Sequence, residues 1–370
     1  MQTSPVAEFK ATSVENAPTV PAESVVTVVP RPGEPVAAVF RRLADELTAG
    51  AAVPTAMMLY GTIAAHAEIT RAMRDAWGET NWPVTWIEGA GCDSTPLAGI
   101  QMFAVRDRPV TRVRLGGRVV ASVFEDAGAQ HCLVGGVSPV AVTLPPTAQT
   151  QQAFSHLETA LDMAGFTLAD VVRTWFFNDD ILGWYADFNR VRSAHYAGVK
   201  WRTGSLPAST GIGARNPTGA ALVVGARALR PTDGAVRAVE VGSPLQCPAP
   251  AYGSAFARAM ELNLAGGRQL LVSGTASIHP DGRTAWVGEA AKQVDLTMEV
   301  IGAILQSRGL GFGDVTRATA YYRDAADKRH FDRWLADSGL QAMPVVHTHS
   351  VVCRDDLLFE VELDAVTVGA

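Results

Sequence analysis

The feature that most constrains this chain is an internal repeat. The segment AGFTLADVVRTWFF starts at Ala164 and resembles RGLGFGDVTRATAYY, which starts at Arg308. The pairs that coincide in one register are Gly165 with Gly309, Asp170 with Asp314, Val171 with Val315, Arg173 with Arg317, and Phe177 with Tyr321. Coincidences at a constant offset are the signature of a duplicated structural unit.

The surrounding residues show what this unit contains. An amphipathic helix that ends at glycine precedes each junction, at 150–165 and 290–309, and a second helical pattern follows, at 181–196 and 325–339. Strand-like segments stand ahead of the first helix, at 118–125 and 131–144 in one copy and at 267–278 in the other. We therefore expect a β-β-α-β-α-β unit.

A fainter third copy lies nearer the N-terminus. Helical patterns at 36–50 and 64–78 flank a strand at 55–61, and the closing segment VTWIEGAGCDSTPLAGIQMFAV resembles VVHTHSVVCRDDLLFEVELDAV, with Cys92-Asp93 where the other has Cys353-Arg354. The opening hairpin of this copy is shortened or lost. The predicted organisation is a disordered tail at 1–24, a degenerate repeat at 25–108, and two fuller repeats at 109–232 and 233–370, the last carrying the site.

The repeats predict a particular assembly. A sheet with both helices on one face leaves its other face uncovered, and three such sheets can bury those faces around a common axis. The alternative is three domains joined by linkers, but no long Gly/Ser-rich or Pro-rich linker separates the copies. We expect an α+β intramolecular pseudo-trimer that is monomeric or forms a low homo-oligomer.

Composition narrows the class of partner. The formal net charge is −6 and no run of Lys and Arg is present, which argues against nucleic acid as a ligand. No apolar stretch is long enough for a membrane span, the N-terminus lacks a signal-peptide pattern, and the four cysteines have no paired metal-type spacing. These features predict a protein of the reducing cytoplasm.

Several segments carry a family resemblance over roughly residues 110–370. They are LLVSGTASI from Leu270, the Gly288-Glu289 turn, the helix with Gln293, CRDDLLFEVE from Cys353 to Glu360 and on to Glu362, VRTWFF, FNRVR, and YGSAFARA from Tyr252. The chain resembles the YjgF/RidA superfamily and, within it, the chorismatases. This resemblance implies the trimeric α+β fold.

The resemblance also implies an activity. Chorismatases cleave the enolpyruvyl ether of chorismate and release pyruvate, with a glutamate as acid that falls on Glu360 and, in some members, a cysteine that falls on Cys353. RidA-type deaminases instead hydrolyse imines and enamines, and hold the substrate carboxylate with an arginine in a P-x-R segment. The corresponding stretch, Pro344-Val345-Val346-His347, has no arginine, which argues against ordinary RidA deamination.

The residues around Glu360 support an acid independently. Leu357, Leu358, Phe359 and Val361 are apolar, so the Glu360 carboxyl should be partly desolvated and its pKa raised. A carboxyl that stays protonated near neutral pH can donate a proton to an ether oxygen or an enol carbon. The alternative is a strand glutamate that faces water. Its counterparts in the other repeats, near Val224 and Gly99, cannot act as acids, which predicts one functional interface and two degenerate ones.

A carboxylate substrate requires arginine, which binds carboxylates through two parallel hydrogen bonds. The candidates are Arg354, Arg215, Arg192 and Arg173. Tyr252 could add a phenolic hydrogen bond. The alternatives are surface ion pairs for each arginine and a core or interface position for the tyrosine.

Two further residue types are candidates for chemistry. Cys353 is either a wall of the site or a small buried apolar residue. His347 and His349 point to the same face of a strand and could form a metal pair, but no third ligand is evident, so we expect neither metal nor cofactor.

The sequence therefore predicts a cofactor-free enzyme acting on a small carboxylate, of chorismatase type, with Glu360 as general acid. A Rid-type imine or enamine deaminase that uses Arg354 or Arg215 is the second possibility. A non-catalytic small-molecule binder or scaffold is the third.

Overall fold

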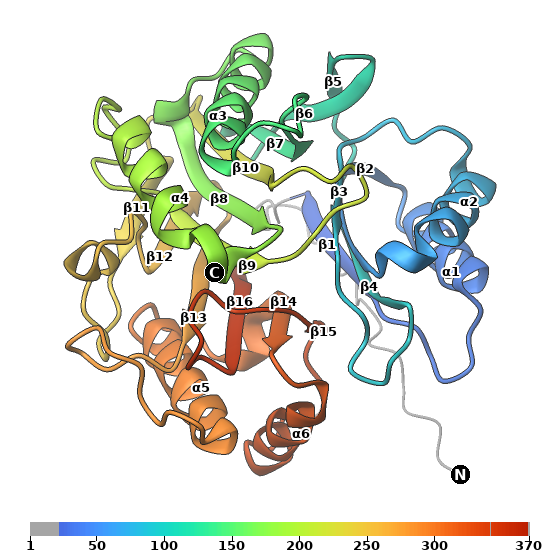
Figure 1. The fold of residues 1–370 in the computed structure, drawn as a ribbon. Coiled ribbons are helices and arrows are strands. Elements are labelled where there is room, and N and C mark those ends of the chain that lie inside the picture. Colours follow the sequence, from blue (N-terminus) through green and yellow to red (C-terminus); the bar gives the residue numbers. More distant parts are fainter. Residues whose placement is uncertain (1–21, 341, 369–370) are drawn as a thin grey trace.

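A computed structural model describes residues 22–340 and 342–368. These residues form three sheets, each covered by helices on one face (Figure 1). None of the helices within these ranges has the length and apolar character needed to cross a membrane. Most of the predicted tail at 1–24 lies outside the described residues.

The first repeat is the shortest. Its elements are β1 (Glu23–Val28), α1 (Val36–Ala49), β2 (Ala52–Gly61), α2 (His66–Trp77), β3 (Val84–Ile87) and β4 (Leu97–Arg106). The sheet order is β1-β4-β2-β3, so one opening strand, β1, remains of the opening hairpin. Strand β1 begins inside the predicted tail, where Glu23 pairs with Val105 of β4 and forms a buried ion pair with Arg227 of the second repeat, at 2.6 Å.

The second and third repeats share one topology. The second consists of β5 (Thr111–Leu115), β6 (Arg118–Asp126), β7 (Ala129–Val137), α3 (Pro146–Met163), β8 (Val171–Asn178), α4 (Ile181–Tyr196), β9 (Ala208–Gly213) and β10 (Leu222–Pro231). The third consists of β11 (Arg237–Val241), β12 (Ala259–Leu264), β13 (Gly267–Ala276), α5 (Ala290–Gln306), β14 (Val315–Tyr322), α6 (Lys328–Asp337), β15 (Val345–His349) and β16 (Phe359–Val368). The orders β5-β6-β7-β10-β8-β9 and β11-β12-β13-β16-β14-β15 are equivalent. Each unit therefore extends the expected β-β-α-β-α-β pattern by a third opening strand and a short parallel edge strand.

The duplicated residues have identifiable structural roles. Gly165 and Gly309 follow α3 and α5 with φ of 79° and 69°, a left-handed conformation that glycine adopts without strain. Asp170 and Asp314 then accept backbone N–H groups three residues earlier, at 2.9 and 2.8 Å, and so fix the turn into the next strand. The recurrence in the sequence is therefore the recurrence of one helix-to-strand turn.

The three sheets pack around a shared core. This core contains Tyr60 and Phe103 from the first repeat, Trp175 and Phe177 from the second, and Tyr321 from the third, all almost fully buried. The helix pairs α1/α2 and α5/α6 and the helix α3 lie at the periphery (Figure 1). Burial of the inner sheet faces against one another confirms the α+β fold of three repeats in an intramolecular pseudo-trimer.

A buried charge cluster lies within this core. Arg317 donates to Glu362 at 2.8 Å and to Asp364 at 2.8 Å, and Arg173 donates to the other oxygen of Glu362. These side chains are at most 2% exposed. The duplicated arginines thus converge from two repeats on one carboxylate, which joins the second sheet to the third.

Candidate active site

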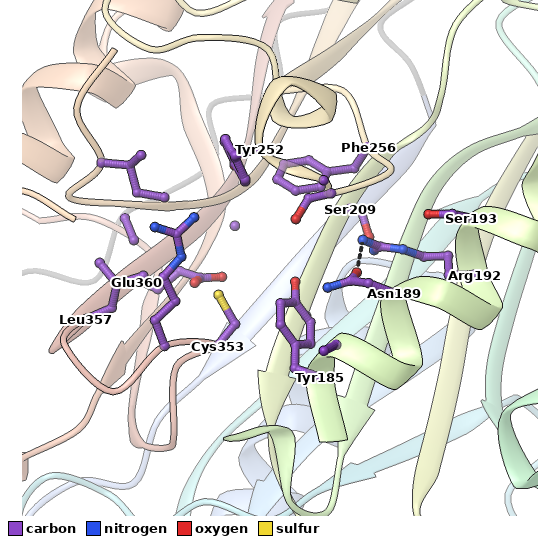
Figure 2. A pocket seen from close by; sticks show the side chains of 18 of the residues that line it. Tyr185, Asn189, Arg192, Ser193, Ser209, Tyr252, Phe256, Cys353, Leu357 and Glu360 are labelled. Atoms are coloured by element: carbon purple, nitrogen blue, oxygen red, sulfur yellow. Dashed lines mark hydrogen bonds between the residues drawn. The ribbon is translucent and has the colours of Figure 1, made fainter. Parts of the chain in front are cut away.

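A cavity of about 470 Å³ lies at the interface between the second and third repeats. Strand β9 of the second repeat meets β13 of the third there, and the backbone N–H of Ser209 donates to the Ser273 hydroxyl at 2.8 Å. Figure 2 shows Glu360 and Cys353 of the third repeat across the cavity from Asn189 and Arg192 of the second. The polar lining residues include Tyr185, Asn189, Arg192, Ser209, Tyr252, Arg258, Cys353, Arg354 and Glu360.

Glu360 lies in the wall of this cavity near the start of β16. It pairs with Ala276 of β13 on one side and with Tyr321 of β14 on the other. An ideal Cβ on Gly274 would stand 2.1 Å from its Oε1 atom, so a larger residue there would displace the carboxyl from this position. Within the described residues no protein group donates a hydrogen bond to it, and the residue is 5% exposed. The carboxyl is therefore packed against backbone and open only to the cavity.

The environment of Glu360 favours its neutral form. Burial raises its pKa, and the negative charge of Glu362 raises it further, to about 8, although Arg173 and Arg258 act in the opposite direction. Glu362 is equally buried, but there the positive charges of Arg317 and Arg173 outweigh burial and lower the pKa to about 2. At neutral pH a protonated carboxyl, Glu360, thus lines the cavity, and the ionised Glu362 lies buried behind it.

Cys353 also lines the cavity. Burial, reinforced by the nearby Glu360, raises the pKa of its thiol to about 12. A thiol with this pKa is a poor nucleophile at neutral pH because the thiolate is the reactive form. Cys353 packs against a small apolar cluster that includes Ala276, Ile278 and Leu357, which fits a wall of the site.

Four arginines line the cavity. Arg190 forms an exposed ion pair with Asp187 at 2.6 Å, and one of the other three escaped the sequence analysis. Arg354 donates to the carbonyl of Gly282 at 2.9 Å, and Arg192 donates to Asn189 at 2.6 Å. Arg258, which sequence reasoning missed, is 2% exposed and donates twice to the carbonyl of Cys247, at 3.0 and 2.8 Å. None of the three forms an ion pair with a carboxylate within the described residues, so each retains charge to offer a ligand.

Tyr252 connects two of these arginines. Its ring centroid lies 5.2 Å from the guanidinium carbon of Arg258 and 5.2 Å from that of Arg354, both in cation–π geometry. Tyr252 belongs to a short 3-10 turn, Ala249–Tyr252, in the long connection between β11 and β12. The equivalent strands of the second repeat, β5 and β6, are joined by Gly116 and Gly117 alone. An insertion specific to the third repeat, 242–258, therefore supplies Tyr252 and Arg258.

Arg173 and Arg215 do not line this cavity. Arg173 is fully buried and is held by Glu362, the Thr210 hydroxyl at 2.9 Å and the Val272 carbonyl at 2.7 Å. It acts on Glu360 through its charge, from behind the wall. Arg215 lies at a separate depression, where it forms a bidentate ion pair with Glu88 at 2.6 and 2.8 Å.

The two histidines have separate partners. His347 Nδ1 lies 2.8 Å from the Tyr322 hydroxyl, and burial lowers its pKa to about 4. His349 is exposed, and its Nε2 lies 3.1 Å from the carbonyl of Arg323. No three His, Cys, Asp or Glu side chains of the described ranges gather as a metal site would require.

The other two interfaces lack the acid. Tyr321 pairs with Glu360, and the equivalent Phe177 pairs with Val223, one residue from the Val224 expected from sequence. In the first repeat Tyr60 pairs with Gly99, the position expected. A Cβ on Gly99 would lie 2.8 Å from the Val346 side chain, so the interface between the third and first repeats is filled there.

The stretch Pro344–His347, which lacks the RidA arginine, does not belong to the cavity that contains Glu360. These residues lie at or beside β15, which packs on β4 of the first repeat, away from Glu360. The strand that faces Glu360 is β9, where Ser209, Thr210 and Gly211 stand. Strand β9 also has no arginine, so the arginine of RidA-type deaminases is absent from the strand that faces Glu360.

The fold is similar to that of solved structures. A crystal structure of a chorismatase aligns over 94% of this chain and 99% of its own, with a TM-score of 0.64 and 19% identity. The E. coli YjgF gene product covers 34% of this chain at 19% identity, with 97% of its own chain aligned and a TM-score of 0.28. E. coli TdcF, solved with bound serine, covers 35% at 18% identity, with 98% of its own chain aligned and a TM-score of 0.29. A comparison with curated proteins found no match.

At the level of sequence, the family model described as endoribonuclease L-PSP matches residues 135–223 and 249–367. These two segments cover more than half of the chain and fall in the second and third repeats. The chain therefore belongs to the endoribonuclease L-PSP family, the YjgF/RidA family whose motifs its sequence contains.

Proposed function

We propose that this chain is a cofactor-free enzyme that hydrolyses the enol ether of a small carboxylate, chorismate or a related compound, and releases pyruvate. The observation that carries this proposal is the Glu360 carboxyl, which has a pKa raised to about 8 and faces a cavity lined by Arg192, Arg258 and Arg354. A neutral acid beside cations suits a substrate that is an anion and must accept a proton.

The reaction needs acid–base chemistry alone. Glu360 donates its proton to the terminal methylene carbon of the enolpyruvyl group, and the C=C electron pair forms the new C–H bond. The resulting oxocarbenium ion takes up water, which loses a proton to the Glu360 carboxylate. The hemiketal then collapses: the bond to the ether oxygen breaks, the alcohol leaves with a proton, and pyruvate remains.

The charge of the neighbouring residues fits these steps. Before the proton transfer, the ionised Glu362 opposes ionisation of Glu360. After the substrate has taken up the proton, the same negative charge stabilises the positive oxocarbenium ion. Arg258 and Arg354 are assigned to the substrate carboxylate near Tyr252, and Arg192 to the polar groups at the opposite side of the cavity. Cys353 forms part of the wall.

The proposal is tested by incubating the enzyme with chorismate and following substrate loss and pyruvate release in parallel. Hydrolysis in H₂¹⁸O should place the label in the carbonyl of pyruvate and leave the ring alcohol unlabelled, because water adds to the former enol carbon. Equal amounts of pyruvate and chorismate lost are expected. Intact chorismate under these conditions would rule the proposed substrate out.

A Rid-type deaminase remains the second candidate, since enamine carbon also accepts a proton from a neutral carboxyl. Its distinguishing measurement is ammonia release from the imine of a small amino acid. Ligand binding without turnover in either assay would favour the non-catalytic binder.

A further inference from the structure

A second cavity, of about 670 Å³, lies at the interface between the first and second repeats. It occupies the place that corresponds to the proposed active site. Gly136 of β7 donates its N–H to the Thr85 hydroxyl at 2.9 Å, as Gly274 of β13 donates to Thr210 at 3.0 Å. The two cavities are thus pseudo-symmetry equivalents, each between a helix of one repeat and the opening strands of the next.

The second cavity has no proton donor equivalent to Glu360. Val223 stands at the position of Glu360. Ala121 pairs with β7 as Ala259 pairs with β13, so the preceding residue, Val120, is the counterpart of Arg258. Its wall also contains Met73, Trp82 and Val84. This interface therefore offers an apolar surface where the other offers an acid.

Three arginines surround that apolar surface. Arg74 comes from α2, Arg114 from β5 and Arg118 from β6. Over the described part of the chain, none forms an ion pair, and Arg114 donates only to the Gly117 carbonyl at 3.1 Å and, weakly, to Asn81 at 3.5 Å. All three arginines are exposed, as is Glu79, whose carboxylate also lines the cavity, and guanidinium groups that no carboxylate pairs are available to bind an anion.

Trp82 gives the cavity an aromatic wall. It lines the cavity and is 8% exposed, yet its indole N–H has no acceptor within the described residues. The N–H atom itself has almost no accessible surface, so a ligand in the cavity would contact Trp82 through the apolar part of the indole.

We propose that this second cavity is a non-catalytic binding site for a small cyclic carboxylate. The carboxylate binds Arg114 and Arg118, with Arg74 at the other side, and the ring packs on Trp82 and Met73. The same chemistry of ring and carboxylate is expected of the alcohol left after enol-ether hydrolysis. The site itself does not depend on the reaction proposed for Glu360.

The test uses ¹⁹F NMR with 4-fluorobenzoate as the probe on the full chain. Two bound signals are expected, because the active-site cavity also has unpaired arginines, and Arg258→Ala identifies the signal that belongs there. The double variant Arg114→Gln/Arg118→Gln should raise the dissociation constant measured from the other signal at least tenfold. A matched control, Arg41→Gln/Arg71→Gln, removes two exposed arginines that do not line either cavity and should leave both signals unchanged.

Two further measurements decide the ligand class. Trp82→Phe leaves a smaller aromatic surface in the cavity wall, so it should lower the affinity of the second site by a smaller factor while the melting temperature stays near that of the wild type. Acetate and inorganic phosphate should displace the probe poorly. The proposal fails if Arg114→Gln/Arg118→Gln binds 4-fluorobenzoate as the wild type does, or if phosphate or acetate binds there as tightly as the aromatic acid.

Discussion

Glu360 and Glu362 lie two residues apart on β16, are both almost fully buried, and have opposite protonation at neutral pH. The difference arises from their partners. Glu362 accepts from Arg173, Arg317, Trp175 and Thr210, whereas no protein donor of the described residues reaches Glu360. The ionised residue thus helps to keep its neighbour neutral.

Replacing Glu360 by Gln should abolish most turnover. Gln keeps the shape of the side chain but cannot donate a proton to carbon, so kcat should fall on the order of 10²–10⁴-fold. Ligand binding, measured by calorimetry with a non-reactive carboxylate, should survive. Glu240→Gln, on an exposed residue of β11, is the control. Full turnover by Glu360→Gln would place the acid elsewhere.

The activity should depend on pH in the direction set by Glu360. Its protonated form is the reactive one and its pKa is raised to about 8, so kcat should be constant through neutral pH and fall as pH rises through about 8. A pH–rate profile measures this limb. A profile that instead rises between pH 7 and 9 would require a base, and would contradict the assignment.

Glu362→Gln should destabilise the fold at neutral pH. It leaves Arg173 and Arg317 without their shared buried carboxylate, and breaking a buried pair in this way costs about 3–5 kcal/mol. The pKa of Glu362 is lowered in the folded protein, so its contribution to the free energy of unfolding is fully present at pH values above the usual pKa of a carboxyl. That contribution is lost as pH falls towards about 2. Denaturant unfolding should show the difference from wild type narrowing over that interval.

In a folded Glu362→Gln protein, the falling limb of the pH–rate profile should also move to lower pH. The repulsion that raises the pKa of Glu360 has been removed, while the charge of Arg173 remains. An unmoved limb would show that burial alone sets this pKa.

Arg258→Ala and Arg354→Ala should each weaken carboxylate binding by about 1.5–3 kcal/mol, the range for a lost hydrogen bond to a charged group. Turnover at saturating substrate should change less than KM. Arg215→Ala provides the comparison, because this side chain is paired with Glu88 outside the cavity. Equal losses in all three variants would indicate a general electrostatic effect.

Much of the architecture could be predicted because local sequence patterns determine the repeated helices, turns and strands. Gly165 and Asp170 recur as Gly309 and Asp314 because one turn needs a left-handed residue and a side-chain acceptor at fixed spacing. Such requirements act over a few residues and are visible in a linear sequence. The raised pKa of Glu360 was foreseen for the same reason, since its neighbours along the strand are apolar.

The composition of the cavity could not be predicted in the same way. Arg258 stands in a segment quoted for its family resemblance, but nothing local shows that the insertion 242–258 brings it beside Glu360. Arg215 and Arg173 were equally plausible cavity residues, and cross-repeat pairing with Glu88 and Glu362 decided their places.

The sequence by itself determined the repeated unit, the α+β class and the position of the candidate acid, because helix periodicity, turn chemistry and apolar flanks are short-range properties. Only the tertiary structure decided which repeat faces Glu360, which arginines share its cavity, and that a second cavity persists at the interface lined by Trp82. Those outcomes depend on how three sheets pack around one axis, and packing joins residues that lie more than a hundred positions apart.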